Sequence, residues 1–183
     1  MLKLVNLKQN KRYIQNAKEL YNSAFPPAER MPFNLLMAKA KGSNVTFWAV
    51  IDEDKFKGLT YTVWHNDIVF IFYLAVAESE RGNGIGTKIL NLIKEQFLNC
   101  RLVLNIEALD ESSDNNDERI RRREFYVKNG FFGAGYNVKE YSVTYENMCF
   151  SPDGRAVTKD EYFKLIEAFC GKLIYFFYKN KCL

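Results

Sequence analysis

The chain has 183 residues, of which 48% are hydrophobic and 26% charged, and its formal net charge is +4. This composition is typical of a folded protein and excludes a disordered chain. No run approaches the roughly 20 apolar residues of a membrane span, and the start of the sequence lacks the apolar core of a signal peptide. We therefore expect a cytoplasmic protein that forms one domain over residues 1–183.

Cysteine and histidine content limits the chemistry that the chain can perform. The four cysteines are far apart and never form a Cys-x-x-Cys motif, so in an intracellular protein they are most simply free thiols. His65 is the only histidine, which excludes zinc sites built on histidine pairs. A Ser/His/Asp triad around His65 stays formally possible, although the chain has no Gly-x-Ser-x-Gly elbow. We expect no metal.

The first half of the chain predicts two helices and three strands. Apolar residues recur at helical spacing over Asn10–Phe25, and the Pro26-Pro27 pair must end that helix. A second helix is predicted from Pro32, at its first helical position, to just before Gly42. Runs rich in β-branched and aromatic residues predict strands, the first two joined as a hairpin and the third central in the sheet, over Val45–Ile51, Phe56–Trp64 and Ile68–Ala77.

The second half predicts further alternation of helices and strands. Helical spacing over Thr87–Asn99 and a buried strand over Arg101–Leu109 come first, and a helix that Gly130 caps follows. Tyr136–Phe150 alternates as two strands or one bent strand. A C-terminal extension, at about 151–183, begins its helix with the capping box Thr158-x-x-Glu161 and ends in a strand-like run at Leu173–Tyr178. The elements form one mixed α/β (α+β) domain, whose core covers residues 10–150.

A glycine-rich turn between the central strand and the next helix carries the strongest functional signal. The segment reads Leu74-Ala75-Val76-Ala77-Glu78-Ser79-Glu80-Arg81-Gly82-Asn83-Gly84-Ile85-Gly86-Thr87. N–H groups at the start of a helix have no internal partner, and with the helix dipole they favour a phosphate. The three glycines let a diphosphate approach the backbone, and Arg81 adds a permanent cation.

Several phosphate ligands are compatible with such a turn. A Walker loop requires Gly-Lys-Ser/Thr, whereas this chain reads Gly86-Thr87-Lys88. A dinucleotide fold requires the turn after the first strand, and here several strands precede it. A tight connection without a ligand is the plain alternative.

Two motifs at the right separation resemble the GNAT acyltransferase family. Arg81-x-x-Gly84-x-Gly86 resembles its acyl-CoA loop, and Phe125-Tyr126-Val127-Lys128-Asn129-Gly130-Phe131 resembles its second landmark, a helix that closes with Tyr and then Gly-Phe. The resemblance covers about residues 10–150 and points to a bacterial branch of unknown acceptor. It implies a GNAT-like fold: a central, mostly antiparallel mixed sheet with a splay at the cofactor, flanked by helices.

The resemblance also implies acetyl-CoA as co-substrate and a set of cofactor contacts. Backbone groups at the end of the central strand would pair with the pantetheine, and an N–H near Val76 would face the thioester oxygen. Many members carry Asn seven residues before the Tyr, where this chain has Arg119, and Asn115 and Asn116 lie further upstream. The implied cofactor-binding residues are Leu74, Ala75, Val76, Arg81, Gly82, Asn83, Gly84, Ile85, Gly86, Thr87, Asn116 and Tyr126.

The implied catalytic residues are Tyr126, Glu107 and Glu29. Tyr126 would protonate the departing thiolate, and its alternative role is that of a core aromatic. The attacking amine must lose a proton to a base, either directly or through water. Glu107 could be that base or could form an ion pair with Arg122 or Arg123. Glu29 would border the acceptor pocket, and the weaker candidates for the base are Glu78 and His65.

Two remaining features have alternative meanings. The arginines of residues 119–123 could bind nucleic acid, but Glu118 and Glu124 interleave with them as local ion pairs, so we expect no nucleic acid partner. The aromatic run at 173–178 could be a homodimer edge. We expect an N-acetyltransferase that moves an acetyl group from acetyl-CoA directly to a primary amine of a small molecule or peptide; the alternative is a catalytically weak acyl-CoA-binding regulatory module. No membrane partner is expected.

Overall fold

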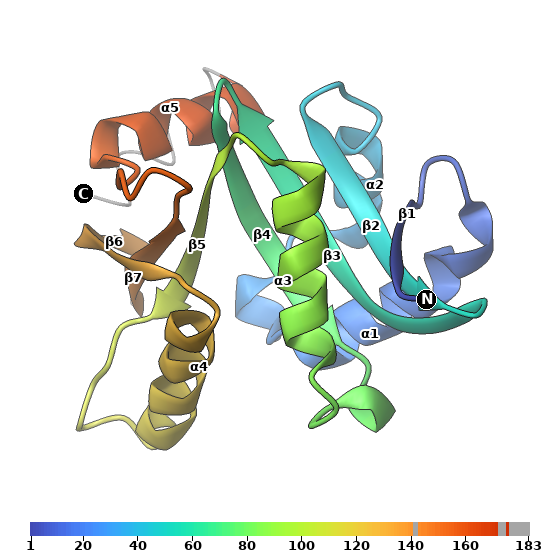
Figure 1. Cartoon of the computed structure of the whole chain (residues 1–183), viewed down its shortest axis with the longest axis horizontal. Helices are drawn as coiled ribbons and strands as arrows, with labels where there is room; N and C mark the ends of the chain where they lie inside the picture. The colour runs from blue at the N-terminus through green and yellow to red at the C-terminus, as the bar shows by residue number, and fades with distance from the viewer. Residues whose placement is uncertain (141–142, 172–174, 176–183) are drawn as a thin grey trace. The chain divides into compact units, whose positions relative to one another are not determined.

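The computed structural model describes residues 1–140, 143–171 and 175 (Figure 1). Its strands are β1 (Lys3–Asn6), β2 (Val45–Asp52), β3 (Lys55–His65), β4 (Ile68–Val76), β5 (Arg101–Glu107), β6 (Phe132–Glu140) and β7 (Val143–Phe150). Its α-helices are α1 (Ile14–Ala24), α2 (Phe33–Lys39), α3 (Ile85–Gln96), α4 (Asn116–Lys128) and α5 (Lys159–Cys170). Three short 3-10 helices are η1 (Lys11–Tyr13), η2 (Pro27–Glu29) and η3 (Glu78–Glu80).

The strands follow the order β1-β2-β3-β4-β5-β7-β6 in the sheet. The pairs β1–β2, β2–β3, β5–β7 and β6–β7 are antiparallel. The pair β4–β5 is parallel, with Ile68–Phe70 in register with Arg101–Val103. The prediction of a mixed α+β fold around a mostly antiparallel sheet is therefore confirmed.

The chain divides into two compact units. The first contains Met1–Trp64 and Ile71–Leu98, and the second contains His65–Phe70 and the chain from Asn99 onward. Strand β4 contributes to both, since its first three residues belong to the second unit. That residues 1–183 act as a single domain stays a prediction.

Aromatic side chains build the core of the first unit. Phe33 of α2 contacts Phe47, which makes an edge contact with Tyr61 of β3 at 5.1 Å between ring centroids. Tyr21 of α1 meets Tyr73 of β4 in the same way at 5.0 Å. Helices α1 and α2 therefore cover one face of these strands, and α3 lies on the other face (Figure 1). Large flat side chains remove much apolar surface from water, which stabilises this layer.

Gly58 of β3 allows an unusually close approach to β4. A Cβ atom at this position would lie 2.5 Å from the carbonyl oxygen of Ala75 and 3.3 Å from the side chain of Ile89 in α3. Glycine is therefore the residue that fits between the end of β4 and this helix. Its position fixes how closely β3 lies beside the strand end that leads to the glycine-rich turn.

In the second unit, Arg101 at the start of β5 is a buried cation that joins two segments. Its side chain is 4% exposed and contacts Asp67 at 2.8 Å and Glu161 of α5 at 2.7 Å. Glu161 is also the third helical residue of the capping box with Thr158, which the structure contains as predicted. The guanidinium thus links the turn before β4, the start of β5 and the first turn of α5.

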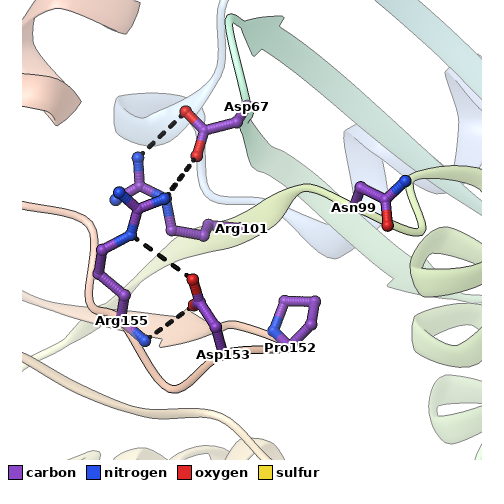
Figure 2. A pocket seen from close by; sticks show the side chains of 6 residues that line it. All are labelled: Asp67, Asn99, Arg101, Pro152, Asp153 and Arg155. Atoms are coloured by element: carbon purple, nitrogen blue, oxygen red, sulfur yellow. Dashed lines mark hydrogen bonds and ion pairs between the residues drawn. The ribbon is translucent and has the colours of Figure 1, made fainter.

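A small surface pocket lies beside Arg101. Figure 2 shows that Asp67, Asp153 and Arg155 point toward one another across it, and Asn99 and Pro152 complete its lining. Arg155 contacts Asp67 at 3.2 Å and Asp153 at 3.8 Å. Because these charges are already paired with each other, we assign no ligand to this pocket.

Several predicted boundaries need correction. Pro32 is the N-cap of α2 rather than its first helical residue. Helix α3 begins at Ile85 rather than Thr87 and ends at Gln96, because Gly84 already occupies the cap. The alternating stretch before residue 150 is two strands, β6 and β7. The predicted terminal strand at 173–178 lies outside the described residues, except for Tyr175.

The remaining composition-based expectations concern thiols and membranes. Cys100 and Cys149 are free thiols, as predicted, and Cys182 lies outside the described residues. Among the helices that the structure describes, none is both long and apolar enough to cross a bilayer. No group of metal-ligating side chains is found in residues 1–140, 143–171 and 175.

Candidate active site

The glycine-rich turn has the backbone conformation that its glycines predict. Gly82 and Gly84 lie at φ +79° and +70°, in the left-handed region that side chains rarely adopt. A Cβ atom at either position would meet nothing within 4 Å, so this side of the turn is open. Gly84 is the N-cap of α3, and it accepts the first helical hydrogen bond from the N–H of Lys88 at 3.2 Å.

The first turn of α3 presents donors to an anion. The N–H groups of Ile85, Gly86 and Thr87 find no acceptor among the described residues, as expected at a helix start. This turn contains no acidic residue, and the side chain of Arg81 is exposed beside it. Free donors, the positive end of the dipole and a neighbouring cation together suit a phosphate.

An ion pair fixes η3, the short helix that precedes the glycine-rich turn. Lys57 of β3 contacts Glu80 of η3 at 2.6 Å, and both side chains are largely buried. The N–H of Ala77 donates to the carbonyl of Lys57 at 2.9 Å, which continues the pairing of β3 with the end of β4. Glu78, one of the weaker candidates for the base, is exposed on η3. The turn is therefore attached to the sheet on both sides of η3.

The last three residues of β4 are Leu74, Ala75 and Val76, and they differ in burial. Ala75 is buried, whereas Leu74 and Val76 are half-buried. Gly58 faces Ala75 on the β3 side, as described above. These are the three strand residues that the resemblance places along the pantetheine.

Tyr126 lies near the end of α4 and is half-buried. Its ring makes edge contacts with Phe125 at 5.1 Å and Phe131 at 5.6 Å. Gly130, at φ +80°, ends the helix as predicted and turns the chain so that the N–H of Phe131 donates to the Tyr126 carbonyl. The ring is thus fixed by its neighbours, and its hydroxyl makes no hydrogen bond with the described part of the chain.

The Tyr126 hydroxyl is a proton donor at neutral pH. Desolvation raises the pKa of Tyr126 to about 12, although the positive charge of Arg122 acts in the opposite direction. A pKa above the physiological range keeps the phenol protonated, which is the form that a general acid requires.

Both oxygens of Glu107 are occupied by cationic or amide groups. Oε1 contacts Arg119 at 3.1 Å, and Oε2 contacts Arg122 at 3.2 Å and the amide of Asn115 at 3.4 Å. The predicted ion pair with Arg122 is confirmed. The alternative with Arg123 is wrong, because Arg123 contacts Glu146 of β7 at 2.9 Å.

Arg119, the departure from the family pattern, has a defined place. It is 14% exposed, donates from Nη1 to the Ala108 carbonyl at 2.8 Å and from Nε to Asn115 Oδ1 at 2.8 Å. Sequence reasoning missed this contact set, because partners in other elements leave no periodic signal. Asn116 begins α4, and its side-chain oxygen accepts from the N–H of Asp110 at 3.0 Å.

Glu29 belongs to the first unit and lies at the end of η2, where it is exposed. The Tyr73 hydroxyl of β4 donates to the Glu29 carbonyl at 2.8 Å and accepts from the N–H of Met31 at 3.3 Å. Tyr73 therefore attaches the segment around Glu29 to the sheet, a role that its place in an aromatic run conceals. His65 is half-buried at the end of β3.

The predicted site residues fall in different units, and each group is described within its own unit. The glycine-rich turn, the end of β4 and Glu29 belong to the first unit, and Tyr126, Glu107 and Asn116 belong to the second. Within the second unit, Glu107 and α4 meet through the ion pairs described above.

Comparison with known proteins supports the family resemblance. Residues 43–131 match the family model of the acetyltransferase (GNAT) domain, a range that contains both the glycine-rich turn and Tyr126. No curated protein sequence matches the chain.

Solved structures match over nearly the whole chain. An acetyltransferase assigned to the GNAT family from Bacteroides thetaiotaomicron is 18% identical with a TM-score of 0.70, covering 96% of this chain and 98% of that one. An aminoglycoside 6'-N-acetyltransferase complexed with coenzyme A is 16% identical (TM-score 0.63; 81% and 95% covered). A ribosomal-protein alanine N-acetyltransferase from Escherichia coli is 13% identical (TM-score 0.63; 87% and 98% covered).

At these identities the structures establish the fold, and the family model matches residues 43–131. The chain has the GNAT fold, and its residues 43–131 are similar to the acetyltransferase (GNAT) domain.

Proposed function

We propose that the protein transfers an acetyl group from acetyl-CoA directly to a primary amine. The observation that carries this proposal is the first turn of α3, whose N–H groups are free behind two left-handed glycines, with Arg81 beside them. A diphosphate fits such a turn because its charge and oxygens match the donors. The solved relative with coenzyme A supports the choice of cofactor.

Each predicted cofactor residue has a role in this proposal. The turn from Arg81 to Thr87 holds the diphosphate, and backbone groups of Leu74 and Val76 pair with the pantetheine amides. An N–H near Val76 stabilises the thioester oxygen, where negative charge develops as the amine attacks. The small side chain of Ala75 takes up little space beside the cofactor. Asn116 contributes a polar contact to the cofactor from the start of α4.

The transfer requires the movement of two protons. The ammonium first loses one proton, and its lone pair attacks the thioester carbonyl. When the carbon–sulfur bond breaks, Tyr126 gives its proton to the sulfur, and the phenolate recovers a proton derived from the amine nitrogen. Glu29 or a water molecule accepts the other proton; Glu107 is less suited because both of its oxygens are engaged. The products are an amide, the free thiol and one proton.

The acceptor is proposed as a primary amine of a small molecule or peptide. Two relatives of the same fold are named for an aminoglycoside and for an alanine of a ribosomal protein. Both kinds of acceptor present an amine that must be deprotonated before attack. A homodimer through the C-terminal run stays a further proposal.

The test compares acetyl-CoA binding and thiol release in matched glycine variants. Gly84→Asp places a carboxylate next to the diphosphate, so we expect the loss of acetyl-CoA binding by calorimetry and of thiol release with an amine panel. Gly154→Asp is the control, since Gly154 lies at φ +75° with no atom within 4 Å of its Cβ position. Unchanged affinity in Gly84→Asp would contradict the phosphate assignment. Tight binding without thiol release in the unmodified protein would instead support a regulatory acyl-CoA-binding module.

A further inference from the structure

Arg122 is placed to act on the hydroxyl of Tyr126. The two residues are four positions apart on α4, so their side chains lie on the same face of the helix. Arg122 is 46% exposed, and Nη1 is its only group with a protein partner in the described chain, Glu107 at 3.2 Å. Arg122 therefore shares a helix face with Tyr126, and most of its donors have no partner in the described chain.

Glu107 holds Arg122 without cancelling the local charge. Its side chain is 13% exposed, and Arg119 occupies its other oxygen. Arg119 is itself fixed by the Ala108 carbonyl and by Asn115. One carboxylate thus faces two guanidinium groups, so this cluster keeps one net positive charge.

Arg123, the residue next to Arg122 on α4, is already paired. Glu146 of β7 is engaged by Arg123 at 2.9 Å, so that pair contributes no net charge. The positive charge of Arg122 opposes the rise in the Tyr126 pKa that burial causes. A nearby positive charge stabilises a phenolate more than a phenol.

We infer that Arg122, held by Glu107, is a positioning residue that stabilises the negative charge left on the Tyr126 oxygen as its proton moves to the leaving sulfur. In that step the O–H bond breaks, an S–H bond forms, and the electron pair stays on the phenolic oxygen. The catalytic role of Arg122 rests on the proposed function. Its electrostatic effect on Tyr126 does not. In this inference, Glu107 holds the Arg122 side chain in place.

The first experiment measures the pairing without activity. Protein labelled with 3-fluorotyrosine, which is more acidic than tyrosine, is titrated by fluorine NMR, and the Tyr126 signal is assigned by its loss in Tyr126→Phe. We expect Arg122→Gln to raise the Tyr126 pKa by about half to one unit and Arg122→Lys to restore most of the difference. Arg121→Gln is the matched control on the same helix and should change nothing.

A Tyr126 pKa that is unchanged in folded Arg122→Gln would overturn the inference, whatever the activity of the protein. A rise in both Arg122→Gln and Arg121→Gln would also overturn it, because general helix charge would then explain the effect.

The second experiment links the pairing to turnover. Arg122→Gln should lower kcat by about 3- to 30-fold with little change in acetyl-CoA affinity, and should have no further effect in a Tyr126→Phe background. Additive losses would overturn the inference. If the unmodified protein releases no thiol but the pKa shift is found, the proposed function fails while the charge pairing stands.

Discussion

Removal of the Tyr126 hydroxyl separates its role in catalysis from its role in cofactor binding. Tyr126→Phe keeps the ring contacts with Phe125 and Phe131 and removes the proton donor. We expect kcat to fall about 10- to 1,000-fold, with acetyl-CoA affinity changed by less than about tenfold. Steady-state kinetics and calorimetry on the folded variant measure the two quantities. Near-normal kcat would contradict the general-acid assignment and would leave thiolate departure to water.

Residues of the site differ in how far sequence alone could reveal them. Gly82 and Gly84 were predictable because a strand followed by glycines and a helix is a local pattern, and their positive φ values follow from it. The partner of Glu107 was only half predictable. The choice between Arg122 and Arg123 depends on which helical face meets β5, and a helix with arginines at successive positions does not signal that face.

At the level of elements, the close approach of β3 and β4 depends on Gly58. Gly58→Ala places a Cβ 2.5 Å from the Ala75 carbonyl, so the strands must separate. We expect the free energy of unfolding to fall by about 1–3 kcal/mol, as in other overpacked interiors. Urea unfolding measures it, with Gly154→Ala as control, where only backbone strain of about 1 kcal/mol is expected. An unfolding free energy equal to that of the unmodified protein would show that β3 can yield without cost.

Helix α5 should be attached less firmly in acid. Hydrogen bonds from Arg101 hold the pKa of Glu161 down to about 2, so the folded state favours the charged carboxylate more than the unfolded chain does. This contribution to stability is present above about pH 4.3, the ordinary Glu value, and disappears as the pH falls through about 2. Glu161→Gln should therefore cost about 1–3 kcal/mol near pH 7 and almost nothing near pH 2. Urea unfolding at both pH values checks this, and a pH-independent difference would contradict it.

Boundaries of helices and strands were predictable from the sequence where neighbouring residues determine them. The capping box of α5 was predicted to the residue, because Thr158 and Glu161 satisfy each other within one turn. The start of α2 was missed by one position: Pro32 has an extended ψ of 126° and caps the helix from outside. The neighbours of β5 were beyond prediction, because hydrophobic alternation in β7 does not say which strand it pairs with.

For the whole molecule, acetyl-CoA should stabilise the folded chain. A ligand at about 100 times its Kd adds about 2.7 kcal/mol to the free energy of unfolding when it binds only the folded state. Thermal denaturation with and without acetyl-CoA should reveal this as a higher Tm, and Gly84→Asp should abolish the increase. A Tm increase that persists in Gly84→Asp would place the binding energy away from the glycine-rich turn.

The contacts of Arg101 have an evolutionary consequence. Arg101 lies within residues 43–131, the range that matches the family model, whereas two of its acceptors, Ala156 and Glu161, lie beyond that range. Loss of α5 would remove Glu161, one of the three residues that accept hydrogen bonds from the Arg101 guanidinium. Because an unpaired buried guanidinium is costly, we expect a substitution at position 161 to be tolerated only with a compensating change at position 101.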